Sequence, residues 1–302
     1  MGERAEGGVA TAQAGRDEGS VDCADGRRLA FREYGAPNGA PVFYFHGWPG
    51  SRLDFAPNHA AAVAAGVRVI AVDRPGMGGS DWQRGRRVLD WPADVAAVAD
   101  TLGLDRFAVL GFSFGGPYAR ACGYALAERV TRVILVSSVG PLDDPAAGGA
   151  LLPRPLRLTL LLARRSPVLA LPLIWRSARQ ARAVAVDRGP PDWMPPADAA
   201  VVGSPEVASC LRASACECFR RGIRGAAHDS AAIARGEGFA PEDIATEVQI
   251  WHGEDDRSDP VAMARSQERR IPRASARYVE DGGHLILFSH AAEILAGVGG
   301  ST

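Results

Sequence analysis

A serine between glycines is the feature of this sequence with the clearest chemical potential. Residues 111–115 read Gly-Phe-Ser-Phe-Gly, directly after an apolar run and before a segment of helical spacing. Glycines two positions to either side of Ser113 allow the tight strand-to-helix turn that exposes a nucleophilic hydroxyl. We therefore predict that Ser113 is a nucleophile. The alternative is a glycine-rich turn whose serine has no catalytic role.

A serine hydroxyl attacks efficiently only when a base takes its proton, and His284 is the histidine best placed to do so. It ends an Asp-Gly-Gly-His stretch, residues 281–284, between the last predicted strand and the last predicted helix. A loop at that end of a sheet can hold the imidazole over the serine. His46 belongs to another motif, and the remaining histidines have no comparable context: His59, His228, His252 and His290.

An acid that orients the histidine is expected on a second loop. Residues 251–260 read Trp-His-Gly-Glu-Asp-Asp-Arg-Ser-Asp-Pro and supply three aspartates after a predicted strand. Adjacent side chains on an extended loop point apart, so at most one of Asp255 and Asp256 can face His284. The other would be a solvated turn residue or a helix cap.

The stretch His-Gly-Trp-Pro-Gly, residues 46–50, follows another predicted strand. Acyl transfer passes through a tetrahedral intermediate whose oxyanion needs two backbone N–H donors. We predict that Phe114, next to the nucleophile, and Trp48 donate them. The alternative for residues 46–50 is an ordinary Pro-Gly turn.

The elements that would position these residues follow from the hydrophobic pattern. Short β-branched and aromatic runs alternate with alanine-rich segments of helical spacing, which is typical of a mostly parallel central sheet flanked by helices. The fold class is therefore predicted as α/β, and the continuously apolar runs as strands covered on both faces. We predict strands over residues 42–45, 67–72, 107–111, 133–137, 248–251 and 276–279, and helices over residues 53–65, 92–102, 261–270 and 285–296.

The pattern divides the chain into three kinds of segment. Residues 21–140 and 241–302 form the predicted α/β core, whereas residues 141–240 show no strand alternation and are predicted to be an inserted helical cap. The thirteen arginines of this cap are expected to form a solvated face. Residues 1–20 lack the apolar run of a signal peptide, so we expect a flexible tail and a cytoplasmic protein.

Composition narrows the classes of function. All 34 basic residues are arginine, which excludes catalysis through a lysine amine, as in PLP enzymes or the P-loop of NTPases. The formal net charge of -1 gives no overall attraction to nucleic acid or to a membrane surface, and neither is expected as a partner. The five cysteines have no metal-binding or disulfide spacing, and we expect no cofactor.

The four chemical motifs, in this order, resemble the α/β-hydrolase superfamily, over residues 21–140 and 241–302. Residues 73–81, Asp-Arg-Pro-Gly-Met-Gly-Gly-Ser-Asp, are similar to another loop of that superfamily. The resemblance implies that the acid stands three residues after Gly253, which selects Asp256. Asp259 departs from the pattern, because an apolar residue is usual there.

The oxyanion loop is similar to that of epoxide hydrolases and haloalkane dehalogenases, which attack with an aspartate. Ser113 would instead form an alkyl ether that water could not open, and none of the five tyrosines lies in the cap to activate an epoxide. We therefore expect a serine hydrolase that cleaves a carboxylic ester or lactone through an acyl-enzyme. The alternatives are a C–C bond (diketone) hydrolase or amidase with the same triad, and a non-catalytic small-molecule-binding protein of this fold.

The cap is expected to select a small apolar or aromatic substrate. Its large apolar residues are the predicted contacts: Trp175, Trp193, Met194 and Phe219. The alternative is that they only pack the cap. A homodimer is compatible with the sequence.

Overall fold

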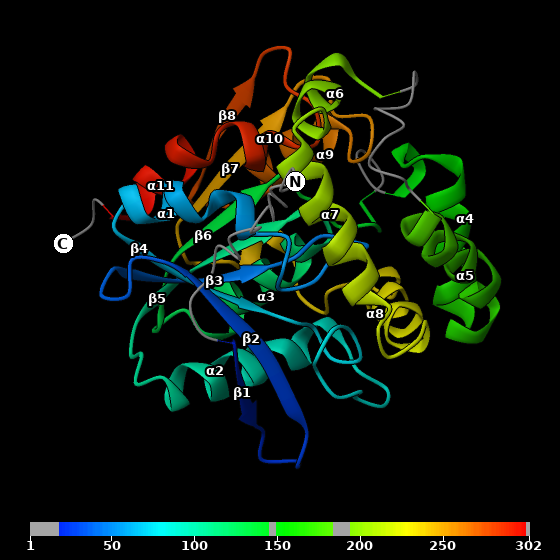
Figure 1. Ribbon diagram of the computed structural model, residues 1–302, viewed down its shortest axis with the longest axis horizontal. Coiled ribbons are helices and arrows are strands. Elements are labelled where there is room, and N and C mark those ends of the chain that lie inside the picture. Colours follow the sequence, from blue (N-terminus) through cyan, green and yellow to red (C-terminus); the bar gives the residue numbers. More distant parts are fainter. Residues whose placement is uncertain (1–17, 145–148, 184–193, 300–302) are drawn as a thin grey trace, which may run out of the picture.

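The computed structural model describes residues 18–144, 149–183 and 194–299, and its centre is a twisted sheet (Figure 1). The described strands form one eight-stranded sheet in the order β1-β2-β4-β3-β5-β6-β7-β8, with β1 and β2 antiparallel to their neighbours and the other pairs parallel. This confirms the predicted α/β class. The strands are β1 (Glu18–Asp22), β2 (Arg28–Gly35), β3 (Ala40–Phe45), β4 (Val67–Val72), β5 (Phe107–Phe112), β6 (Val130–Val136), β7 (Val248–Gly253) and β8 (Ala274–Val279).

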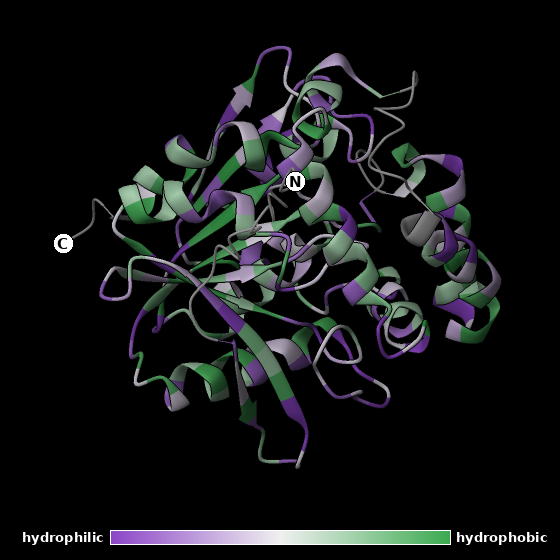
Figure 2. Ribbon diagram, in the orientation of Figure 1, coloured by the Kyte–Doolittle hydropathy of each residue, from purple (hydrophilic) through white to green (hydrophobic). Residues whose placement is uncertain are grey.

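Helices cover both faces of this sheet. The side chains of β3 alternate between two buried apolar clusters, with Val42 and Tyr44 in one and Phe43 and Phe45 in the other. The central strands are accordingly largely hydrophobic in Figure 2. One face packs against α1 (His59–Ala64), α10 (Ile286–Ser289) and α11 (Ala291–Gly299); the other packs against α2 (Trp91–Thr101), α3 (Gly116–Ala125) and α9 (Val261–Arg270).

Most predicted elements are present, with some differences at their ends. The strand predicted over 67–72 and the helix predicted over 261–270 coincide with β4 and α9. The helix predicted over 53–65 is only α1, preceded by a 3-10 turn over Ala56–Asn58, because Pro57 disfavours a continuous helix there. The helix predicted over 285–296 is divided into α10 and α11.

The beginning of the described chain differs from the expected tail. Strand β1 begins at Glu18, so the last three residues of the segment 1–20 belong to the sheet. Residues 1–17 lie outside the described residues.

Between β6 and β7 the described elements are helical. They are α4 (Arg154–Arg165), α5 (Pro167–Ala183), α6 (Pro196–Val202), α7 (Pro205–Cys218) and α8 (Arg224–Ala234), together with 3-10 turns at Gly149–Leu151 and Pro241–Asp243. Helices α4 and α5 pack on each other and on α8, and they lie at the right-hand edge of Figure 1. None of the described helices is both long and apolar enough to cross a bilayer.

Candidate active site

Ser113 stands on a strained turn at the carboxyl end of β5. Its φ is +51°, in the left-handed region that residues with a side chain rarely adopt, and a 3-10 turn over Ser113–Gly115 leads from it into α3. A Cβ added at Gly111 would lie 2.6 Å from the carbonyl oxygen of Gly115, and one at Gly115 would collide with the backbone of Phe45. Glycine is therefore required on both sides, as predicted for a turn that presents a serine.

The loop of residues 46–50 lies against this serine. A Cβ at Gly47 would be 3.4 Å from the Cβ of Ser113, and the rings of Trp48 and Phe114 have centroids 6.3 Å apart. The structure thus brings together the two residues predicted to donate backbone N–H groups. Their role toward an oxyanion remains a prediction.

Arg74 is hydrogen-bonded to the loop of residues 46–50. Its guanidinium is fully buried and donates to the carbonyl oxygens of His46 and Gly47, the latter at 3.2 Å. The backbone N–H of Arg74 also donates to His46 Nε2, at 3.3 Å. Burial keeps the pKa of His46 well below its ordinary value, so this imidazole is neutral and can accept that bond.

Asp229 of α8 balances the buried charge of Arg74. It accepts hydrogen bonds from Arg74 Nε and Nη2 at 3.2 and 3.1 Å, from Arg86 at 2.7 Å and from the Tyr118 hydroxyl at 2.7 Å. The sequence analysis missed both residues. Arg74 lies in residues 73–81, whose similarity to a loop of the α/β-hydrolase superfamily could have marked it as part of the site. The residues around Asp229 in the sequence show no such similarity.

His284 is paired with Asp256, at 2.8 Å between Nδ1 and Oδ2. The other oxygen of Asp256 accepts the backbone N–H groups of Ser258 and Asp259 at 2.8 and 2.9 Å, which fixes the carboxylate. Asp255 is exposed. The structure therefore brings His284 together with Asp256, the aspartate selected from the sequence, and not with Asp255.

Charge in this pair is strongly stabilised. Burial opposes the charged form of His284, but the negative charge of Asp256, its hydrogen bond and the further charges of Asp259 and Asp198 raise the pKa of His284 to about 9. Burial likewise opposes ionisation of Asp256, yet the neighbouring charge of His284 lowers the pKa of this carboxyl. Both shifts favour an imidazolium–carboxylate pair.

Asp198 of α6 supports the backbone of the histidine loop. Its carboxylate accepts the N–H of His284 at 3.0 Å and that of Leu285 at 2.8 Å, and its side chain packs against Gly283. Asp198 is buried and comes from the inserted helices. The sequence analysis did not identify it, because nothing near it in the chain marks it.

Asp259 is the partner of the serine hydroxyl in this structure. Ser113 Oγ donates to Asp259 Oδ2 at 3.1 Å, and the other carboxyl oxygen, also buried, has no hydrogen-bond partner among the described residues. Burial raises the pKa of Asp259 to about 7. The residue that departs from the family pattern thus places a second carboxyl group next to both Ser113 and His284.

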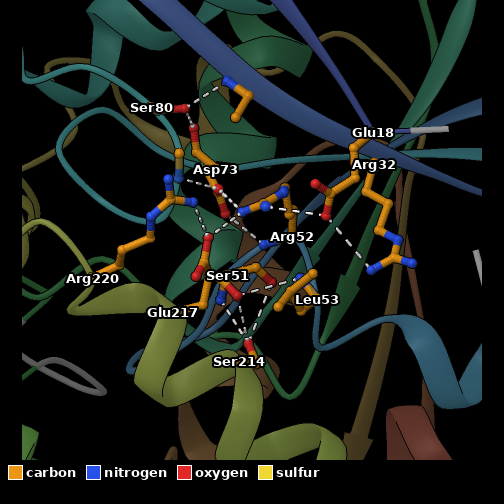
Figure 3. A network of polar contacts seen from close by, with 12 residues as sticks. Glu18, Arg32, Ser51, Arg52, Leu53, Asp73, Ser80, Ser214, Glu217 and Arg220 are labelled. Atoms are coloured by element: carbon orange, nitrogen blue, oxygen red, sulfur yellow. Dashed lines mark hydrogen bonds and ion pairs between the residues drawn. The ribbon is translucent and has the colours of Figure 1, made fainter. Parts of the chain in front are cut away.

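Helix α7 is bonded to residues 51 and 52, which directly follow the loop of residues 46–50 (Figure 3). The N–H of Ser51 donates to Ser214 Oγ at 2.8 Å, and Arg52 bonds to Glu217 of the same helix at 2.7 Å. Arg52 also pairs with the buried Asp73 at 2.6 Å. These contacts fix part of the insertion against the carboxyl edge of the sheet.

The predicted substrate contacts occupy different environments. Phe219 is fully buried in an apolar cluster of the insertion against which Trp48 packs. Met194 is partly buried just before α6, whereas Trp175 is 52% exposed on α5 beneath the guanidinium of Arg179. Trp193 lies outside the described residues. Phe219 is thus brought near Trp48, a residue of the predicted oxyanion hole.

The chain is similar to known proteins of one family. Residues 42–297 match the model of the alpha/beta hydrolase family. A non-heme chloroperoxidase from Streptomyces lividans is 38% identical over 125 residues, covering 41% of this chain and 45% of that protein, and the bifunctional esterase/perhydrolase DCH of Acinetobacter calcoaceticus is 35% identical over 131 residues, covering 41% and 46%. These alignments span less than half of each curated relative.

The solved structure of an esterase from Thermogutta terrifontis superposes with a TM-score of 0.67 at 21% identity, over 94% of this chain and 97% of that one. At this identity the likeness concerns the fold. The family model matches residues 42–297, most of this chain, and the chain therefore belongs to the alpha/beta hydrolase family.

Proposed function

We propose that this protein is a serine hydrolase that cleaves a carboxylic ester or lactone through an acyl-enzyme. The observation that carries the proposal is the left-handed turn at Ser113, which lies against Gly47 and whose hydroxyl bonds to Asp259, three residues after the aspartate that pairs with His284. A strained backbone at a buried serine costs stability and is typical of a nucleophile held for attack. The esterase among the relatives supports the same chemistry.

In the proposed reaction the hydroxyl of Ser113 turns from Asp259 toward neutral His284, which takes its proton as the oxygen attacks the carbonyl carbon. The backbone N–H groups of Trp48 and Phe114 stabilise the oxyanion of the tetrahedral intermediate. The imidazolium then protonates the leaving alcohol. Water, deprotonated by His284, releases the acid and restores the hydroxyl of Ser113.

The substrate is proposed to be small and apolar or aromatic, with the helices of the insertion acting as a cap. Support comes from Phe219 and its apolar neighbours, which pack beside Trp48, and from the contacts that hold α6, α7 and α8 against the catalytic loops. A panel of short and long acyl esters, lactones, amides and a C–C-linked diketone would separate an ester hydrolase from an amidase or diketone hydrolase. No turnover of any member would favour a non-catalytic binding protein.

Covalent labelling tests the central step. A fluorophosphonate should label the protein once, at Ser113, and the label should disappear in Ser113→Ala and form much more slowly in His284→Ala. Ser137→Ala is a matched control, because Ser137 is also a buried serine with a positive φ, at the end of the neighbouring strand β6. Labelling of Ser137 or full ester turnover by Ser113→Ala would refute the mechanism.

A further inference from the structure

Most of the exposed large hydrophobic side chains in the described part of the chain lie on helices α4 and α5 and the turn before them. Nine large hydrophobic side chains are exposed in the described part of the chain, and six of them lie within residues 149–183. We call the exposed side chains of this segment the α4–α5 face. Its apolar members, with their exposed fractions, are Leu151 (44%), Leu158 (48%), Leu161 (55%), Val168 (67%), Leu169 (50%) and Trp175 (52%).

The same face carries one sign of charge. Residues 149–183 contain seven arginines and no aspartate or glutamate. Removing a segment of charge +7 from a chain of charge -1 leaves -8 for the remainder. Six of these arginines belong to the α4–α5 face: Arg154, Arg157, Arg164, Arg165, Arg176 and Arg179.

Among the described residues, no carboxylate forms an ion pair with any of these six arginines, although Asp143 lines the same pocket as Arg157 and Arg164. Arg157 donates to the carbonyl oxygen of Ala150, and the guanidinium of Arg179 lies 4.8 Å from the ring centroid of Trp175. In the described part of the chain, the positive charge of the face therefore has no ion-pair partner.

The helices are amphipathic with their apolar and cationic groups mixed on the outer side. On α4, Thr159, Leu160 and Ala163 are buried and the helix packs on α8, whereas Leu158 and Leu161 are about half exposed. In Figure 2 hydrophilic and hydrophobic residues alternate along both helices. Arginine stems can lie along apolar surface while the guanidinium reaches phosphate, as in helices that lie in a membrane interface.

We propose that the α4–α5 face docks on a membrane surface that contains anionic phospholipid, with both helices lying in the plane of the interface. The charge of the face favours a membrane over a second copy of the chain. A two-fold contact between two copies would place the same arginines opposite each other, which is repulsive. Anionic headgroups would instead pair with the arginines, and the acyl region would accept the leucines and Trp175. The remainder of the chain, at -8, would be repelled from the same surface and so oriented away from it.

This proposal departs from the expectation that a membrane is not a partner. That expectation averaged the charge over the whole chain, and the opposite charges of the α4–α5 face and of the remainder cancel in the sum. Docking is independent of the proposed hydrolase activity, because it uses no residue of the Ser113 site.

Co-sedimentation of the full chain with vesicles tests the proposal. The wild-type protein should sediment with vesicles of phosphatidylcholine and phosphatidylserine, far less with phosphatidylcholine alone, and less as salt is raised. Arg164→Gln/Arg165→Gln should lower the partition coefficient about fivefold for each charge removed. Leu158→Gln/Leu161→Gln should also weaken binding, because the apolar contact is lost.

Two matched controls keep the test specific. Val63→Gln replaces a side chain that is 48% exposed on α1, the same fraction as Leu158, and should sediment like wild type. Arg84→Gln/Arg106→Gln removes two exposed charges elsewhere and should have less than half the effect of the α4–α5 double variant on the logarithm of the partition coefficient. Circular dichroism checks that each variant folds.

Three results would overturn the proposal. They are equal sedimentation with both kinds of vesicle, no sedimentation with either, and loss of binding in the controls to the same extent as in the α4–α5 variants. If sedimentation velocity without lipid shows a dimer that Leu158→Gln/Leu161→Gln dissociates, the face is a contact between copies of the chain instead. Hydrolysis of a soluble ester is measured separately, so failure here leaves the proposed catalytic function untouched.

Discussion

Two buried aspartates, Asp256 and Asp259, interact with His284 and Ser113. Asp256 bonds to His284, and Asp259 accepts the hydroxyl of Ser113, so the serine is not bonded to its proposed base in this structure. Both carboxylates raise the pKa of His284. At the scale of single residues, the reaction therefore depends on which of these groups carries a proton.

Exchanging Asp256 for asparagine tests its role in the proposed triad. Asp256→Asn should lower kcat by about 10⁴-fold, because an amide can stabilise neither the required tautomer of His284 nor its charged form. Asp255→Asn makes the same change on the adjacent, exposed side chain and should leave kcat nearly unchanged. Steady-state kinetics on one ester would decide, and the reverse ranking would assign the acid to Asp255.

Asp259 should set the pH at which the enzyme becomes active. His284 must be neutral to act as a base, so kcat/KM should rise with pH through the pKa of this group, and a nearby negative charge moves that rise to higher pH. Asp259→Asn should shift the acidic limb of kcat/KM toward lower pH by about one unit. Asp255→Asn is again the control. An unshifted limb in Asp259→Asn would show that Asp259 does not act on the base.

At the scale of elements, the helices between β6 and β7 contact the loops of the candidate site at three points. Asp198 of α6 holds the backbone of His284, Ser214 of α7 holds Ser51, and Asp229 of α8 holds Arg74. Each contact joins the insertion to a different loop at the carboxyl edge of the sheet. These helices are therefore part of the framework of the candidate site.

Removing the charge of Asp229 should damage both stability and activity. Asp229→Asn leaves two buried guanidinium groups without their carboxylate, and breaking a buried ion pair costs about 3–5 kcal/mol of unfolding free energy. Because Arg74 bonds to carbonyl groups of the loop that is proposed to bind the oxyanion, kcat should fall in the folded fraction as well.

Glu242→Gln is the matched control for Asp229→Asn. Glu242 pairs with Arg270 at 2.7 Å in an exposed position, where an ion pair contributes at most about 1 kcal/mol. Urea unfolding followed by circular dichroism gives the two free energies. Similar losses in both variants would mean that the Asp229 cluster does not hold the insertion on the core.

At the scale of the whole molecule, buried titratable groups should make stability depend on pH. Burial raises the pKa of Asp54 to about 8 and that of Asp259 to about 7, so the native state binds more protons than the unfolded state from about pH 4 up to these values. Stability from both groups falls as pH rises across this range. The raised pKa of His284 adds stability below pH 6.5 that is lost as pH rises through about 9.

Asp256 acts in the opposite direction on the acid side. Its lowered pKa adds stability above the unfolded value, and this contribution is lost as pH falls through the folded value. Burial lowers the pKa of His46, His228 and His252, and these groups add stability as pH rises to about 6.5.

Above about pH 7 the contributions of Asp259, Asp54 and His284 all decrease, so we expect the free energy of unfolding to fall from about pH 7 to about pH 9. Urea titrations at several pH values measure it. In Asp54→Asn the decrease between about pH 7 and about pH 8 should be shallower, and an unchanged slope would contradict the assigned burial effect.

The sequence alone determined features that depend on neighbours along the chain. Strand β4 and helix α9 follow from hydrophobic period and were predicted with their observed ends. The turn at Ser113 was predictable because its glycines stand two residues away, where the backbone itself demands them. The loop of His284 was predicted in the same way, from its place in the sequence between the last strand and the last helix. Strands β1 and β2, at the edge of the sheet, were not individually predicted.

Only the tertiary structure decided which polar groups meet. The partner of the Ser113 hydroxyl is Asp259, 146 residues away, and the N–H of His284 is held by Asp198, 86 residues away on an inserted helix. The likeness to the family selected Asp256, yet the physical reason for the choice is the turn that buries it while Asp255 faces solvent. Such contacts depend on how separate elements pack. The residues next to an aspartate in the sequence do not show whether that packing will bury its carboxylate.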